Sequence, residues 1–170
     1  MTIVSVVFDF DGTIALGQGP LDAYARCVGE LAGTAVADAC IEAVREFSTG
    51  TSPHADAYAA IRAAALGHGV DDVLLSRAYL RSRELLATDG APIQAPAGLA
   101  EFTADLAETA RLIVATNAPV IGLDRALAVL GVADVVTAVY ASVGKPAGLD
   151  AIVAPLIADG PTLAVGDIWD

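Results

Sequence analysis

Four short runs of β-branched and other apolar residues, separated by helical patterns, constrain the possible folds of this chain more than any other feature. The runs are typical of buried strands and cover residues 3–8, 111–116, 135–141 and 162–165. Apolar residues at helical spacing precede each of the last three runs, at Leu99, Phe102 and Leu106, at Val120, Leu123, Leu127 and Leu130, and more weakly over residues 149–158. This alternation predicts right-handed crossovers and an α/β fold, with a parallel sheet covered by helices on both faces.

The stretch between the first and second runs departs from this alternation. From about residue 21 to residue 87 the sequence is rich in alanine and contains no convincing strand. Glycine-containing breaks separate four helical patterns, at residues 22–31, 37–47, 55–65 and 72–86. We therefore predict an all-helical domain over residues 19–91, inserted into an α/β core domain formed by residues 1–18 and 92–170.

Composition excludes several classes of partner. The formal net charge of −12 argues against binding to a nucleic-acid backbone, which requires clustered basic residues. The longest uncharged apolar run, residues 2–8, is far too short to cross a membrane, and no signal peptide is recognisable. Cys27 and Cys40 lie in alanine-rich helical patterns and indicate buried thiols of a reduced protein more than a disulfide. We therefore expect a cytoplasmic protein without nucleic-acid or membrane partners.

Polar or charged residues follow each of the predicted strands. Ligands of open parallel α/β sheets bind beyond the carboxyl ends of the strands, so these residues are expected to meet at one edge of the sheet. The four segments are Asp9-Phe-Asp11-Gly12-Thr13, Thr116-Asn117, Gly144-Lys145-Pro146 and Gly166-Asp167. Lys145 is the only lysine of the sequence, and its compact ammonium is not equivalent to the guanidinium groups that the chain uses elsewhere.

This set of residue types indicates phosphoryl transfer. Clustered carboxylates need a cation, and oxygen ligands without His or Cys suit Mg²⁺ rather than zinc or a redox metal. Thr13 and Thr116 can hydrogen-bond phosphate oxygens, backbone N–H groups around Gly12 can cradle an anion, and Lys145 supplies positive charge where negative charge develops. One carboxylate can act as the nucleophile, and a second can act first as an acid and then as a base.

The motifs DFDGT, VATN, GKP and VGD, in this order, resemble the four signature motifs of the haloacid-dehalogenase-like superfamily. The helical insert after the first motif resembles the helical cap of that family. The resemblance implies a Rossmann-like core with Asp9 as the nucleophile and Asp11 as the general acid and base. It also implies that Mg²⁺ is held by Asp9, by the backbone carbonyl of Asp11 and by Asp167.

The remaining motifs receive roles from the same resemblance. Thr116 is expected to bind the phosphoryl group with Asn117 beside it, and Lys145 to stabilise Asp9 and the phosphoryl oxygens. Each assignment also has a purely structural interpretation: a turn for Asp9 and Asp11, a helix start for Thr116 and Asn117, a surface lysine before a proline turn, and a turn or cap residue for Asp167.

The acid at Asp11 favours a phosphatase or a phosphomutase, because the dehalogenases of the superfamily lack an acid at that position. We expect a Mg²⁺-dependent phosphomonoester hydrolase that acts on a small phosphate ester through an aspartyl-phosphate. A phosphomutase with the same site is the first alternative. A catalytically impaired phosphate-binding or interaction protein is the second, because the sequence ends at Asp170, where members of the family usually continue, and so looks truncated.

Two residues of the insert and its first linker are candidates for substrate contacts. Gln18 follows the first motif closely, and His54 ends the polar break Gly50–His54 between two predicted helices. A cap tethered by two linkers can close over a site, exclude water and select the substrate. An ordinary loop between helices is the alternative interpretation of the break.

Overall fold

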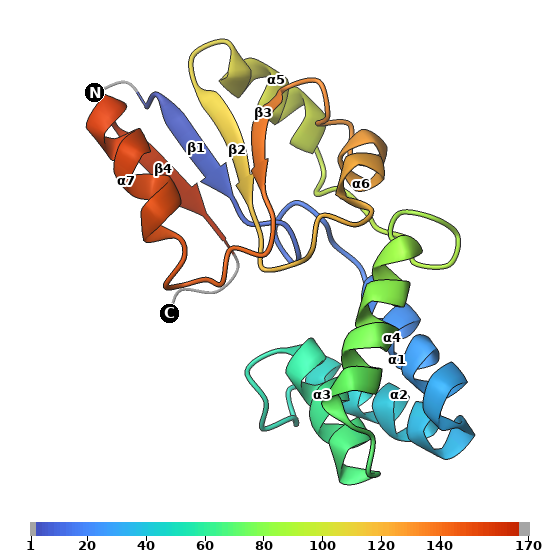
Figure 1. Ribbon diagram of the computed structural model, residues 1–170. Coiled ribbons are helices and arrows are strands. Elements are labelled where there is room, and N and C mark those ends of the chain that lie inside the picture. Colours follow the sequence, from blue (N-terminus) through green and yellow to red (C-terminus); the bar gives the residue numbers. More distant parts are fainter. Residues whose placement is uncertain (1–2, 167–170) are drawn as a thin grey trace. The chain divides into compact units, whose positions relative to one another are not determined.

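The chain forms two compact units, which are described separately. The computed structural model describes residues 3–166. Residues 1–17 and 93–170 belong to one unit, here called the sheet unit, and residues 18–92 form the other, the helical unit. Figure 1 shows the elements of each unit along the chain.

The sheet unit is built on four parallel strands. They are β1 (Ser5–Phe8), β2 (Arg111–Ala115), β3 (Val136–Tyr140) and β4 (Thr162–Val165). Their order across the sheet is β3-β2-β1-β4, so β1 is hydrogen-bonded on both sides (Figure 1). The predicted parallel sheet is therefore confirmed, and each strand lies within one of the four predicted runs. Because all strands point the same way, their carboxyl ends share one edge of the sheet.

Helices cover both faces of this sheet. They are α5 (Leu99–Ala107), α6 (Leu123–Val129) and α7 (Asp150–Asp159). Apolar residues of α7, among them Ile152 and Val153, pack against Val7 and Ile113, and α5 and α6 lie on the opposite side (Figure 1). Alternate strand residues point to opposite faces, which accounts for the continuous burial of β1.

Two details of the predicted helical faces are wrong. Phe102 was expected on the buried face of its helix but is 56% exposed, and Thr103 is buried instead. The Thr103 hydroxyl donates to the Leu99 carbonyl at 2.8 Å, so its burial leaves that polar group satisfied. Val120 is 64% exposed and precedes α6, because Gly122, with φ of 78°, stands immediately before the first helical residue.

The helical unit contains four helices, as predicted. They are α1 (Gly19–Ala32), α2 (Thr34–Ser48), α3 (Ala57–Gly67) and α4 (Asp72–Glu84). Asp56 and Asp71 cap α3 and α4, accepting hydrogen bonds from the third residue beyond each. Throughout residues 3–166, no helix combines the length and the apolar character that crossing a bilayer requires.

Aromatic rings and thiols contribute to the otherwise aliphatic core of the helical unit. Tyr24, Tyr58 and Tyr79, from three different helices, have ring centroids 5.5–6.1 Å apart. Cys27 and Cys40 are both buried and neither forms a disulfide. The prediction that both thiols are buried is thus confirmed.

Burial of two titratable groups should make the helical unit sensitive to alkali. It raises the pKa of Tyr24 from 10.0 to about 12 and that of Cys40 from 9.0 to about 11. Above pH 9 the unfolded chain loses protons that the folded chain keeps, so stability that is fully present below pH 9 declines as the pH rises through 9 to 11. We expect the urea midpoint of the helical unit, followed by far-UV circular dichroism, to fall between about pH 8 and about pH 10.5.

Two phenylalanine variants test whether Tyr24 contributes to this dependence of stability on pH. Tyr24→Phe keeps the ring but removes the hydroxyl, so it should weaken the dependence of the urea midpoint on pH. Tyr140→Phe changes a half-exposed tyrosine of the sheet unit and should leave the dependence unchanged. A wild-type midpoint that is constant over this range would contradict the prediction.

Candidate active site

Asp9 is the first residue beyond the central strand β1. Its backbone N–H donates to the Val165 carbonyl of β4 at 2.8 Å, which continues the ladder by one residue. Its carboxylate oxygen Oδ1 accepts a hydrogen bond from the Phe10 N–H at 2.6 Å. Phe10 is fully buried, so the chain turns its aromatic side chain into the interior between the two acids. The rigid end of β1 thereby fixes where the Asp9 carboxylate lies.

Lys145 pairs directly with this carboxylate. Its Nζ lies 2.5 Å from Asp9 Oδ1, and the two side chains are 19% and 23% exposed, respectively. Oδ1 therefore has two donors, the ammonium and the Phe10 N–H. Within residues 3–166, the second oxygen Oδ2 makes no hydrogen bond or ion pair. The two oxygens of this carboxylate therefore differ in their bonding within the described part of the chain.

The loop after Asp9 uses its own backbone N–H groups. The Phe10 carbonyl accepts from Thr13, Ile14 and Ala15 at 2.9–3.3 Å, and the Gly12 N–H donates to the Ala15 carbonyl at 3.0 Å. Gly12 has φ of 81°, which favours glycine. The N–H groups of residues 12–15 are thus engaged inside the loop. Binding of an anion by the backbone around Gly12 stays a prediction.

The Thr13 hydroxyl differs from the surrounding backbone groups in its hydrogen bonding. Its Oγ1 is buried and has no hydrogen-bond partner among the residues that the structure describes. A buried hydroxyl without a partner costs about 1–3 kcal/mol, so such a group indicates a position that a ligand can satisfy. A contact of Thr13 with the substrate stays a prediction.

Two further acids were predicted to hold a metal with Asp9. Asp11 is half-buried two residues further on, and its backbone bridges to Ala15. Asp167 lies outside the described residues, and within residues 3–166 there is no group of three or more His, Cys, Asp or Glu side chains placed to hold a metal ion. The predicted donors that the structure describes, the Asp9 carboxylate and the Asp11 carbonyl, supply oxygen atoms, which fit a hard cation.

Thr116 and Asn117 follow β2 at the same edge of the sheet. Thr116 is buried, and its Oγ1 accepts from the Ala118 N–H at 3.0 Å, which leaves its O–H able to donate. The Asn117 side chain contacts the backbone of Lys145: Oδ1 accepts from its N–H at 2.6 Å, and Nδ2 donates to its carbonyl at 3.4 Å. Helix α6 begins only at Leu123, so these two residues are not its start, which was the alternative interpretation.

The two candidates of the helical unit form hydrogen bonds within that unit. The Gln18 side chain donates to Ser48 Oγ at 2.8 Å, and that hydroxyl donates to the Val44 carbonyl. The His54 N–H donates to Ser52 Oγ at 3.3 Å. Contacts of Gln18 and His54 with a substrate stay predictions.

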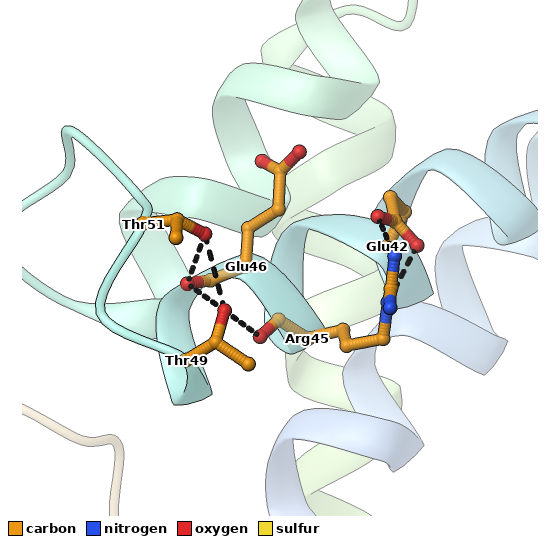
Figure 2. A network of polar contacts seen from close by, with 5 residues as sticks. All are labelled: Glu42, Arg45, Glu46, Thr49 and Thr51. Atoms are coloured by element: carbon orange, nitrogen blue, oxygen red, sulfur yellow. Dashed lines mark hydrogen bonds and ion pairs between the residues drawn. The ribbon is translucent and has the colours of Figure 1, made fainter.

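The loop that leads to His54 is anchored at the end of α2. Figure 2 shows the network: the Glu46 carbonyl accepts from both threonine hydroxyls, Thr49 and Thr51, at 3.1 and 3.0 Å. It also accepts the Thr51 and Ser52 N–H groups. This carbonyl is one of those that a helix leaves unpaired at its C-terminus. The loop therefore has a defined path that begins as a helix cap.

The sequence was compared with models of known protein families. A model of the haloacid dehalogenase-like hydrolases matches residues 6–167. This range covers almost the whole chain. The chain belongs to the haloacid dehalogenase-like hydrolase family. The family membership that the four motifs predicted is thereby confirmed.

Solved structures share the fold of this family member at low sequence identity. A predicted phosphoglycolate phosphatase from Haemophilus somnus has a TM-score of 0.60 at 15% identity, over 98% of this chain and 78% of its own. YfnB from Bacillus subtilis, a HAD-hydrolase by description and bound to magnesium, has a TM-score of 0.53 at 18% identity, over 84% of this chain and 64% of its own. L-2-haloacid dehalogenase from Xanthobacter autotrophicus has a TM-score of 0.51 at 20% identity, over 95% of this chain and 69% of its own.

A comparison with curated proteins finds no match. The present chain spans less than two thirds of the length of YfnB. It spans a larger share of the phosphatase and of the dehalogenase. At such identities the likeness concerns the fold. The chemistry of this chain must be argued from its own residues.

Proposed function

We propose that the protein is a Mg²⁺-dependent phosphomonoester hydrolase that works through an aspartyl-phosphate at Asp9. The observation that carries this proposal is the ion pair between Asp9 and Lys145, at the edge of the sheet that also bears Asp11. A carboxylate with one oxygen paired and the other without a bond in residues 3–166 suits a nucleophile. The family and the phosphatase among the structural neighbours support the same reaction.

The first half of the reaction transfers the phosphoryl group to Asp9. Oδ2 of Asp9 attacks phosphorus, the bond from phosphorus to the ester oxygen breaks, and Asp11 gives its proton to the leaving oxygen. The Lys145 ammonium and the hydroxyls of Thr13 and Thr116 stabilise the charge on the phosphoryl oxygens.

The second half releases phosphate. Asp11, now ionised, takes a proton from water, and the water oxygen attacks phosphorus. The bond between phosphorus and Oδ2 breaks, which regenerates the Asp9 carboxylate. Asp9, the Asp11 carbonyl and Asp167 would hold Mg²⁺, which when bound offsets the negative charge of the carboxylates and of the phosphoryl group.

We propose a small phosphorylated metabolite as the substrate and the cytoplasm as the location. The helical unit, residues 18–92, would act as the cap that selects the substrate, with Gln18 and His54 as contacts. Its two buried thiols, neither in a disulfide, suit a reducing compartment.

The test is turnover by the purified protein. We expect hydrolysis of p-nitrophenyl phosphate with Mg²⁺, loss of that activity with EDTA and recovery when Mg²⁺ is returned. A panel of sugar phosphates and other small phosphate esters then ranks substrates by kcat/KM, and the same panel detects a phosphomutase through isomeric products. Release of chloride from 2-chloropropionate, with no turnover of any phosphate ester, would overturn the proposal in favour of a dehalogenase.

A further inference from the structure

The loop after β2 contacts the segment that carries Lys145 at three consecutive residues. The Thr116 carbonyl accepts from Val143 N–H at 3.0 Å, and the Ala118 carbonyl accepts from Ser142 N–H at 2.8 Å. Between them, the Asn117 side chain contacts both the N–H and the carbonyl of Lys145. The backbone at Lys145 and shortly before it is therefore placed by the loop of the neighbouring strand.

Lys145 itself stands in a compact turn. The Gly148 N–H donates to the Gly144 carbonyl at 3.0 Å, and a Cβ at Gly148 would lie 1.7 Å from the Val143 carbonyl oxygen. Such a close approach of backbone to backbone requires glycine. No side chain other than Asn117, within residues 3–166, hydrogen-bonds to the backbone of residues 142–149. Asn117 thus provides the side-chain contact that fixes this turn against the sheet.

We propose that Asn117 is a positioning residue, which holds the Lys145 backbone so that its ammonium reaches Asp9 Oδ1, instead of a residue that binds the substrate. Its amide supplies an acceptor and a donor on one rigid plane, as the N–H and carbonyl of one residue require. Lysine has four rotatable side-chain bonds, so its ammonium stays beside Asp9 only if the backbone is well placed. The consequence for catalysis rests on the proposed function, but the positioning itself does not.

The single lysine makes this positioning directly measurable. In the full chain labelled with ¹³C,¹⁵N-lysine, the side-chain signals come from Lys145 alone. Asp9→Asn removes the carboxylate charge. Introduced into the otherwise wild-type protein, it should therefore shift the Lys145 side-chain signals. In an Asn117→Ala background we expect Asp9→Asn to shift them less than about half as far, since the two sites are coupled through the backbone of Lys145.

A control in the same loop separates positioning from general damage. Ser142→Ala removes a hydroxyl that makes no hydrogen bond in residues 3–166 and keeps the backbone N–H that donates to Ala118. It should leave the response to Asp9→Asn unchanged. Circular dichroism confirms that each variant is folded. An undiminished response in folded Asn117→Ala would overturn the proposal.

Kinetics then test the catalytic consequence with p-nitrophenyl phosphate and Mg²⁺. Asn117→Ala should lower kcat by about tenfold and change KM by less than about threefold, and it should have no further effect in a Lys145→Met background. A mainly raised KM, or effects that multiply, would show that Asn117 contacts the substrate and would overturn the proposal. Absence of turnover in the wild type would instead refute the proposed function, while the lysine signals still decide the positioning.

Discussion

Asparagine in place of Asp9 should abolish Mg²⁺-dependent turnover of p-nitrophenyl phosphate, with a loss in kcat of at least about 10⁴-fold. The substitution is almost isosteric and keeps an oxygen that can accept from the Phe10 N–H, as Asp9 Oδ1 does at 2.6 Å. It removes the nucleophilic charge and the ion pair with Lys145. The loss therefore reports the nucleophile and not the collapse of the loop.

The covalent intermediate gives a second measurement on the same variant. Wild-type protein quenched in acid during turnover should carry one phosphoryl group by mass spectrometry, and Asp9→Asn should carry none. Asp159→Asn is the matched control, because Asp159 is an exposed partner of Arg111 in the same unit and should leave turnover unchanged. Turnover by Asp9→Asn within tenfold of the wild type would contradict the assignment.

Loss of the lysine ammonium should have the second-largest effect. Lys145→Met keeps most of the aliphatic side chain and removes the charge that lies 2.5 Å from Asp9. We expect kcat to fall by about 10²–10³-fold, the range found when one group that stabilises transition-state charge is removed. Measured kcat and KM with p-nitrophenyl phosphate check this value.

Arginine at position 145 should not substitute for the lysine. A planar guanidinium is larger than an ammonium and spreads its charge over three nitrogens, and only 19% of the Lys145 side chain is exposed. Lys145→Arg should therefore keep less than about a tenth of the wild-type kcat. Arg45→Met, which removes a positive charge from an exposed site of the helical unit, should have no effect. Full activity of Lys145→Met would refute a role for the charge of Lys145, and full activity of Lys145→Arg would refute the requirement for a compact ammonium.

Much of the sheet could be predicted because its determinants are local. Strands such as Ser5–Phe8 are short buried runs, and the alternation with helices fixes parallel pairing and so the shared edge. The helical faces were less certain. Phe102 is exposed and Thr103 is buried, because spacing marks an apolar stripe without showing which part of it meets the sheet. A threonine that bonds to its own helix can also occupy the interior.

The contacts that organise the site could not be predicted from one sequence. The N–H groups near Gly12 turn toward the Phe10 carbonyl, and no residue pattern states which backbone groups a loop pairs internally. The bonds from Asn117 to Lys145 join residues 28 positions apart. In the sequence, the segments around Asn117 and Lys145 are recognisable only as two family motifs. Roles at motif positions can be carried over from a resemblance, whereas the partners of each side chain follow from the packing of loops.

The central place of β1 has a consequence for how the protein loses activity on heating. The strand is paired with β2 and β4, and the Asp9 N–H extends that pairing. Amides in such positions exchange with solvent only in the rarest and largest opening events, while chain ends and surface loops open often. The carboxylate of Asp9 is thus attached to the part of the sheet unit that opens last. Thermal inactivation should therefore coincide with the cooperative unfolding of that unit rather than precede it as a local event.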